Sequence, residues 1–332
     1  MKTETRAFYE AKVRQAVETV VASLARDGEQ ALDYSALAER AALSPFHFHR
    51  IFRGMTGETV LELHRRLRFE RAAWQLGATD DSVTRIAFDA GYESHEAFTR
   101  AFRLRYGRTP SDFRAALRSP LVGEGSAAQP ACVRREQFER AAANGVHFKP
   151  GSEGSSEGLA IHFLVGDETM PGTSERTPIT VEIRDMPALR LVAVRHHGPF
   201  HRISEAFARL GETAGPAGLF GPDTRMVALY HDDPETRAPE DLTSDACMTV
   251  AEDVALPAGL EEIRVAAGAH ACTVHRGPYQ GLGDTWARFL GHWIPNSDHR
   301  LAQGPSYEIY RNAPDPTAPE DLVTELYAPI EQ

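Results

Sequence analysis

The chain has 332 residues, of which 42% are hydrophobic, and a formal net charge of −11. This length suits two or three domains with sizeable cores, while the absence of a long apolar run in the sequence argues against a protein that spans a membrane. The charge is divided unevenly, because residues 1–118 carry 19 Lys and Arg against 16 Asp and Glu, a net of +3, whereas residues 119–332 carry 17 against 31, a net of −14. Any binding to a polyanion is therefore expected in the first part of the chain.

The N-terminal residues lack the apolar segment of a signal peptide, so we expect a cytoplasmic protein. The three cysteines, Cys132, Cys247 and Cys272, have no C-x-x-C spacing and are expected to be reduced thiols. No metal or cofactor motif is present in the sequence, and no cofactor is expected.

The first 118 residues contain an internal repeat. The segment P-F-H-F-H-R-I-F-R at 45–53 returns fifty positions later as H-E-A-F-T-R-A-F-R at 95–103. The pairs kept between the copies are Phe48/Phe98, Arg50/Arg100, Phe52/Phe102, Arg53/Arg103, Gly57/Gly107 and Thr59/Thr109. Each copy follows a short helical pattern, at 37–43 and 86–92, and a tight turn. This order predicts two helix-turn-helix motifs, each with a second helix that enters the major groove of double-stranded DNA.

Helical spacing predicts which side chains of each second helix are exposed. Phe48, Ile51, Phe52 and Met55 form an apolar stripe that should be buried. The residues predicted to face DNA are Phe46, His49, Arg50 and Arg53 in the first copy, and His95, Glu96, Thr99, Arg100 and Arg103 in the second. Arginine, threonine and glutamate can each bond to base edges, although some arginines contact only phosphates. The alternative is an inert helical bundle with a solvated basic face, which the match of outward residues between the copies disfavours.

Residues 58–76 are predicted to form one amphipathic helix between the motifs, with Val60, Leu63, Leu67 and Trp74 on its buried face. Such a helix would fix the two recognition helices about one turn of DNA apart, roughly 34 Å.

Residues 30–118 resemble the DNA-binding domain of AraC/XylS-type transcription regulators, and the second recognition helix, with T-R-A-F-R at 99–103, is most similar to the MarA, SoxS and Rob branch. The resemblance rests on L-S-P at 43–45, G-Y-E-S at 91–94 and Y-G-R-T-P-S-D-F-R at 106–114. It implies contacts with DNA bases from Phe46, His49 and Arg50 and from His95, Glu96, Thr99 and Arg100, and RNA polymerase as a further partner.

Residues 119–177 are predicted to be a flexible linker, because they are rich in glycine and serine and include G-S-E-G-S-S-E-G at 151–158. A short helical stretch near 131–143 and a small ordered element near 159–165 are left open.

A second duplication follows at 178–332. The segment at 194–210 returns at 273–289 with the same H-x-G-P turn, and A-P-E-D-L at 238–242 returns at 318–322. Each copy is predicted to form a β-β-α-β-β unit, with strands near 181–184, 191–196, 226–230 and 247–250 in the first copy. Two such units would give one antiparallel sheet with both helices on one side and a cleft for a small molecule between them. The chain is thus expected to be multidomain, with an all-α double helix-turn-helix domain at 1–118 and an α+β domain at 178–332.

This second half resembles the GyrI-like effector-binding domain. The resemblance implies an acidic residue in the last strand that faces an aromatic pocket, and Glu325 matches that position, with Asp245 as its equivalent in the first copy. The expected pocket walls are Tyr230, Trp286, Trp293, Tyr307 and Tyr310. A buried carboxylate among aromatic rings suits a lipophilic cationic ligand, although aromatic residues in strands often belong to the core instead.

The function expected from these features is that of a ligand-sensing transcription regulator, not an enzyme. Two alternatives remain open: a GyrI-like hydrolase in which Glu325 activates water, and an adaptor whose second half binds a protein partner. His196 and His275 flank the repeated turn and are interpreted as structural residues, not as zinc ligands.

Overall fold

A computed structural model describes residues 2–24, 32–118, 144–148, 161–163, 179–232, 234 and 237–331. It contains two compact units, one formed by residues 1–11, 35–55 and 165–332, and the other by residues 12–34 and 56–164. The expected helical stretch at 131–143, the segment at 151–158 and Cys132 all lie outside the described residues.

Seven helices occupy the described part of the first 118 residues. They are α1 (Lys2–Ser23), α2 (Tyr34–Arg40), α3 (Pro45–Thr56), α4 (Val60–Ala78), α5 (Val83–Asp89), α6 (His95–Tyr106) and α7 (Pro110–Arg118). The two predicted helix-turn-helix motifs are confirmed as α2–α3 and α5–α6. Both turns use a left-handed residue, Gly91 at φ 81° in the second motif and Ala42 at φ 49° in the first.

Helix α4 starts at a capping box, in which Thr59 and Glu62 satisfy each other's backbone N–H groups. Leu63 and Leu67 are fully buried, as predicted, but Trp74 is 40% exposed and its predicted burial is wrong. In the C-terminal half of α4 the buried side chains are those that pack on α5, α6 and α7, and Trp74 is not one of them. The cluster formed there includes Ala72, Ala73, Leu76, Ile86, Phe98, Phe102 and Phe113.

Part of the predicted linker, residues 144–148, is bound to α4. Asn144 Nδ2 donates to the backbone oxygen of Thr56, and the backbone N–H of Phe148 donates to Glu70. Arg66, which is 4% exposed, forms ion pairs with Glu58 at 2.6 Å and Glu70 at 2.8 Å and also donates to the backbone oxygen of Val146. Residues 144–148 are therefore held by hydrogen bonds, unlike the flexible linker that the sequence predicted for them.

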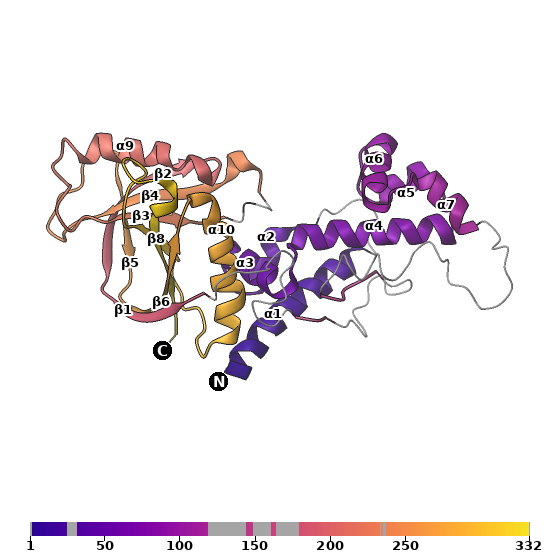
Figure 1. Ribbon diagram of the computed structural model, residues 1–332, viewed down its shortest axis with the longest axis horizontal. Coiled ribbons are helices and arrows are strands. Elements are labelled where there is room, and N and C mark those ends of the chain that lie inside the picture. Colours follow the sequence, from indigo (N-terminus) through magenta and orange to yellow (C-terminus); the bar gives the residue numbers. More distant parts are fainter. Residues whose placement is uncertain are drawn as a thin grey trace. The chain divides into compact units, whose positions relative to one another are not determined.

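Residues between Val181 and Pro329 provide the strands of an eight-stranded antiparallel sheet, in the order β1-β6-β8-β7-β3-β4-β2-β5 (Figure 1). The strands are β1 (Val181–Met186), β2 (Leu189–His197), β3 (Met226–Tyr230), β4 (Thr243–Thr249), β5 (Glu261–Val265), β6 (Gly268–Arg276), β7 (Tyr307–Tyr310) and β8 (Val323–Pro329). Helix α9 (Ser204–Ala214) follows β2, and α10 (Leu282–Arg288) follows β6. The predicted duplicated β-β-α-β-β unit is confirmed. The two copies also exchange their first strands, since β1 pairs with β6 and β5 pairs with β2.

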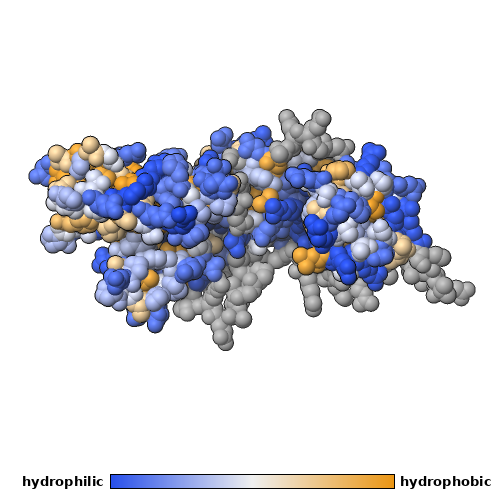
Figure 2. All heavy atoms as spheres, turned by 90° about the horizontal axis from the view of Figure 1, so that it is seen from above, coloured by the Kyte–Doolittle hydropathy of each residue, from blue (hydrophilic) through white to orange (hydrophobic). Residues whose placement is uncertain are grey.

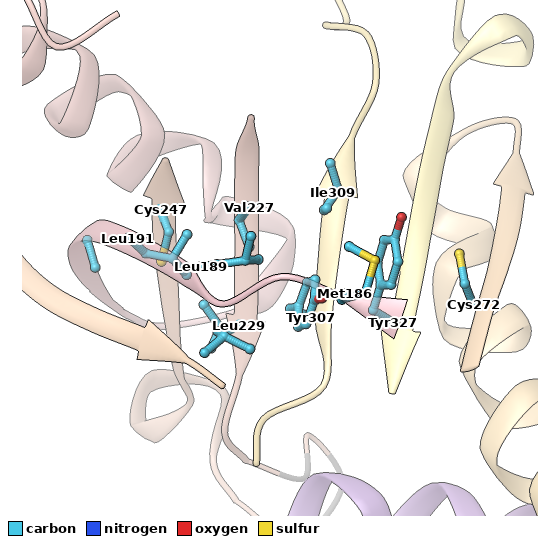
Figure 3. Packing of buried hydrophobic residues seen from close by; sticks show 12 residues of the cluster. Met186, Leu189, Leu191, Val227, Leu229, Cys247, Cys272, Tyr307, Ile309 and Tyr327 are labelled. Atoms are coloured by element: carbon cyan, nitrogen blue, oxygen red, sulfur yellow. The ribbon is translucent and has the colours of Figure 1, made fainter. Parts of the chain in front are cut away.

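The two faces of the sheet have different partners. One face carries a hydrophobic cluster that includes Leu191, Val227, Cys247, Tyr307 and Tyr327 (Figure 3). Leu210 and Ala214 of α9 pack against the other face. Because side chains alternate along β7, Tyr307 and Ile309 belong to the cluster, whereas Glu308 and Tyr310 point to the face that carries the helices.

The unit that contains the sheet also contains α3 and the start of α1. The backbone N–H of Leu301 donates to Tyr9 Oη at 3.0 Å, and the guanidinium of Arg300 lies 4.4 Å from the ring centre of Phe8.

Hydrophilic residues cover much of the face shown in Figure 2, interrupted by separate hydrophobic patches. Within the described residues, no helix has the length and apolar character needed to cross a membrane.

Candidate ligand pocket and DNA-binding helices

A pocket of about 760 Å³ lies on the helix-bearing face of the sheet. Its lining is mostly apolar and aromatic. Its lining includes Arg50, Phe207, Tyr230, Tyr279, Trp286, Glu308 and Tyr310. The size and lining are those of a small-molecule site.

Glu308 of β7 is the acidic residue of this pocket and is 1% exposed. Trp286 Nε1 donates to its Oε1 at 2.7 Å, and the hydroxyls of Tyr310 and Tyr230 donate to its Oε2 at 2.8 and 3.3 Å. Strand pairing places Glu308 opposite Ala228 of β3, in the centre of the sheet. The small side chain of Ala228 leaves room for the carboxyl group. The arrangement holds a buried carboxyl group among aromatic side chains.

Burial raises the pKa of Glu308, and the donors from Trp286 and Tyr310 together with the charge of Arg50 oppose this rise. The pKa values of the Tyr230 and Tyr310 hydroxyls also lie above their ordinary value, first because of burial and then because of the neighbouring Glu308. A positive charge brought into the pocket would therefore favour the ionised carboxylate.

Three of the predicted ligand residues, Tyr230, Trp286 and Tyr310, line this pocket together. Trp293 does not, because it lies beyond α10 and packs on Phe289, with their ring centres 5.9 Å apart. Tyr307 also lies elsewhere, since it belongs to the cluster on the opposite face of the sheet (Figure 3).

The predicted position of Glu325 in the pocket is corrected by the structure. Glu325 pairs with Ile309 in the sheet and so shares the face opposite to Glu308. Its carboxylate accepts hydrogen bonds from Arg184 at 3.2 Å and from Tyr327 Oη at 3.0 Å. The equivalent Asp245 lies on the same face and is bound by Arg195 and His231.

Glu308 was not among the pocket residues predicted from the sequence, although the sequence contains a pattern that indicates its position. In Y-E-I-Y at 307–310, the alternation of a strand puts Glu308 on the same face as Tyr310. Tyr310 repeats Tyr230 eighty positions earlier, so Glu308 takes the place of Ala228 and breaks the symmetry of the duplication. Only the second copy therefore carries an acid at this position.

The second recognition helix, α6, presents most of its predicted DNA-facing residues. Ser94 caps its N-terminus by accepting from the backbone of Ala97, and Gly107 ends it at φ 71°. Glu96, Arg100 and Arg103 are exposed and His95 is half-buried. Thr99 differs from the prediction, because its hydroxyl is buried with no hydrogen-bond partner among the described residues.

The first recognition helix, α3, differs from α6. Arg53 is exposed, whereas Phe46, His49 and Arg50 are all buried, so their predicted exposure is wrong for this conformation. The cause is packing within the unit that contains the sheet. The ring centre of Phe46 lies 5.2 Å from that of Trp286 and 6.3 Å from that of Tyr230.

The repeated turns use their histidines structurally, as interpreted from the sequence. His196 Nε2 lies 3.2 Å from the backbone oxygen of Pro199, and His275 Nε2 lies 3.1 Å from that of Pro278. Both turns also contain a left-handed glycine, Gly198 at φ 127° and Gly277 at φ 119°.

Comparison with known proteins divides the chain in the same way. A helix-turn-helix domain family matches residues 37–116, and a GyrI-like small-molecule-binding domain family matches residues 179–331. The regulatory protein SoxS of Salmonella typhimurium is 34% identical over 104 residues, which are 31% of this chain and 97% of SoxS. The DNA gyrase inhibitor of Yersinia enterocolitica is 30% identical over 128 residues, which are 37% of this chain and 80% of that protein. Among solved structures, the C-terminal domain of EcmrR has a TM-score of 0.41 and 18% identity, over 46% of this chain and 98% of that one.

Proposed function

Because the chain belongs to the AraC-type helix-turn-helix regulators and carries a C-terminal GyrI-like small-molecule-binding domain, we propose that it regulates transcription in response to a lipophilic cation. The observation that supports this ligand class is the buried Glu308 carboxylate among Trp286, Tyr230 and Tyr310. A cation with aromatic groups would pair with the carboxylate and stack on the rings. A contact with RNA polymerase stays a prediction.

The ligand half of the proposal can be tested by titrating tetraphenylphosphonium and the neutral, similarly shaped triphenylphosphine oxide into the full-length protein. Glu308→Gln keeps the shape of the side chain, with an amide oxygen that can accept from Trp286 and an amide N–H that can donate to the Tyr310 hydroxyl, but removes the charge. We expect it to weaken binding of the cation by at least about tenfold, which corresponds to about 1.4 kcal/mol, and binding of the neutral compound much less.

Glu325→Gln is the matched control, because it removes the same charge from the opposite face of the sheet. Its affinity for the cation should equal that of the wild type. Equal losses for the two compounds in Glu308→Gln would contradict the charge preference, and a loss in Glu325→Gln alone would restore the assignment based on resemblance.

The DNA half rests on the exposed face of α6, where Arg100 and Arg103 lie beside Glu96. With a duplex that the wild-type protein selects from a random library, Arg100→Ala should weaken binding by about 1 to 3 kcal/mol, as expected for a lost base contact. The control is Arg276→Ala, which removes one exposed positive charge from the sheet. If both variants bind the selected duplex as the wild type does, α6 is not the recognition helix.

A further inference from the structure

Arg50 of α3 lines the candidate pocket, and Phe46 of the same helix packs on two of the pocket's aromatic walls, Trp286 and Tyr230. Phe46 is 2% exposed and lies with its ring edge-on to Trp286, at an interplanar angle of 82°, and parallel to Tyr230 at 9°. Arg50 lines the pocket itself, and its guanidinium carbon lies 3.6 Å from the centre of the Phe46 ring. A positive charge stacked on an aromatic ring thus lies in the lining of the same pocket as Glu308 and favours the ionised form of that carboxyl group, which is the chemistry proposed for the external ligand.

The rest of α3 is built for close packing in the same unit. His47 Nε2 lies 2.8 Å from Ser306 Oγ, and both residues are buried. Gly54 and Gly291 allow two helical backbones to touch, since a Cβ on Gly291 would lie 2.5 Å from the backbone oxygen of Arg50 and 2.6 Å from the Cα of Gly54. Burial also lowers the pKa of His47 to about 4, with a further contribution from Arg50, so the contact uses a neutral imidazole at pH 7.

The two copies of the helix-turn-helix motif diverge at the positions that make these contacts. Phe46, His47 and Gly54 of α3 stand where α6 has Glu96, Ala97 and Leu104. Glu96 and Leu104 are exposed, whereas their counterparts in α3 are buried. Both copies bury the same phenylalanine pairs, Phe48/Phe98 and Phe52/Phe102, inside their motifs. The additional buried face, formed by Phe46, His47 and Gly54, is specific to α3.

From these observations we propose that Arg50, stacked on Phe46, is an internal occupant of the part of the pocket that Glu308 serves, and that a cationic aromatic ligand displaces Arg50 together with Phe46 and so releases α3. This inference rests on the proposed function. Displacement would expose His49 and Arg50, which are buried in the docked state and which the resemblance assigns to DNA. The ligand then acts by binding the released state better than the docked state, which is what a shift in population requires.

The test uses full-length protein without DNA and tetraphenylphosphonium as the probe. Gly291→Ala forces α3 away without changing a pocket residue, so it should bind the probe at least about fivefold more tightly, because less of the protein is in the closed state. Gly211→Ala in α9 is the control, since a Cβ there meets nothing within 4 Å. It should bind as the wild type does.

Phe46→Ala gives an independent result, because it removes the occupant instead of forcing it out. It should also bind the probe more tightly, whereas a fixed wall of the pocket would lose affinity when truncated. In the wild type, the probe should increase amide hydrogen exchange in residues 45–56. This measurement needs no variant and remains decisive if Gly291→Ala does not fold.

The outcomes separate this inference from the proposed function. A wild-type protein that does not bind the probe would contradict the ligand class itself. Binding that depends on Glu308, with unchanged or weaker affinity in Gly291→Ala and Phe46→Ala and no change of exchange in α3, would overturn the displacement alone.

Discussion

Individual hydrogen bonds influence the pKa of Glu308, the acid of the pocket. Glu308 is almost completely buried, and Trp286 Nε1 is its shortest hydrogen-bond donor, at 2.7 Å. A donor to a carboxylate favours the ionised form and so opposes the rise in pKa that burial causes. Trp286 therefore has two roles, as an aromatic wall and as a donor that favours the ionised form of the acid.

Trp286→Phe keeps an aromatic ring in the pocket wall but removes the indole N–H donor, so the pKa of Glu308 should rise further. A raised carboxyl pKa means that the negative charge, and with it cation binding, is lost at a higher pH as the pH falls. Titrations of tetraphenylphosphonium between pH 5 and 9 should show the loss of affinity shifted upward by about one pH unit, as expected for a lost hydrogen bond of about 1.4 kcal/mol. Trp293→Phe, outside the pocket, should leave the pH profile unchanged. An unshifted profile in Trp286→Phe would refute this role.

Whole elements were more predictable from the sequence than their contacts. The repeats at 45–53 and 95–103 and the duplicated H-x-G-P turn predicted both helix-turn-helix motifs and the β-β-α-β-β units, because local periodicity determines helices and strands. The docking of α3 could not be predicted in this way. It depends on Gly54 meeting Gly291, two residues more than two hundred positions apart in the chain.

The pocket shows the same limit. The sequence predicted Tyr230, Trp286 and Tyr310, since each lies in a repeated element near the cleft. It failed for Glu325 because resemblance to a family places a residue in a strand without determining which face it occupies. A shift by one residue along a strand moves a side chain to the other face, and only the pairing of Ile309 with Glu325 settles the face.

Helix α4 offers a test of how burial changes the strength of an ion pair. The Arg66–Glu70 pair is at i, i+4, with side chains 4% and 3% exposed, and Glu70 also accepts from the backbone of Phe148. Removing Glu70 takes away one of the two ion-pair partners of the buried Arg66 and the acceptor of the Phe148 backbone N–H, so Glu70→Ala should lower the free energy of unfolding by about 1.5 to 3 kcal/mol. The Arg6–Glu10 pair of α1 has the same spacing but side chains 23% and 30% exposed. Glu10→Ala should cost less than about 1 kcal/mol. Urea unfolding of the two variants compares them directly, and similar losses would contradict a special role for the buried pair.

At the scale of the whole molecule, the helix-turn-helix motifs lie in a mildly basic first part of the sequence, and the sheet lies in an acidic second part. Residues 1–118 have a net charge of +3 and residues 119–332 a net of −14. The acidic part is not expected to contact phosphates. Its influence on DNA binding is then expected to act through α3, which belongs to the first part by sequence and to the unit of the sheet by its contacts.

If ligand and DNA both bind best when α3 is released, they must favour each other's binding. Thermodynamic linkage requires the two effects to be equal, so a saturating cation should raise DNA affinity by the same factor by which saturating DNA raises affinity for the cation. We expect a factor of about 5 to 100, the usual range for such coupling. Fluorescence titrations of the full-length protein with the selected duplex and tetraphenylphosphonium, each in the presence and absence of the other, measure both factors. In Gly291→Ala, where α3 is already displaced, both ligands should bind more tightly and the coupling should fall close to one. Coupling that is negative in the wild type would mean that DNA binds the docked state, and coupling that persists unchanged in Gly291→Ala would mean that another element carries the signal.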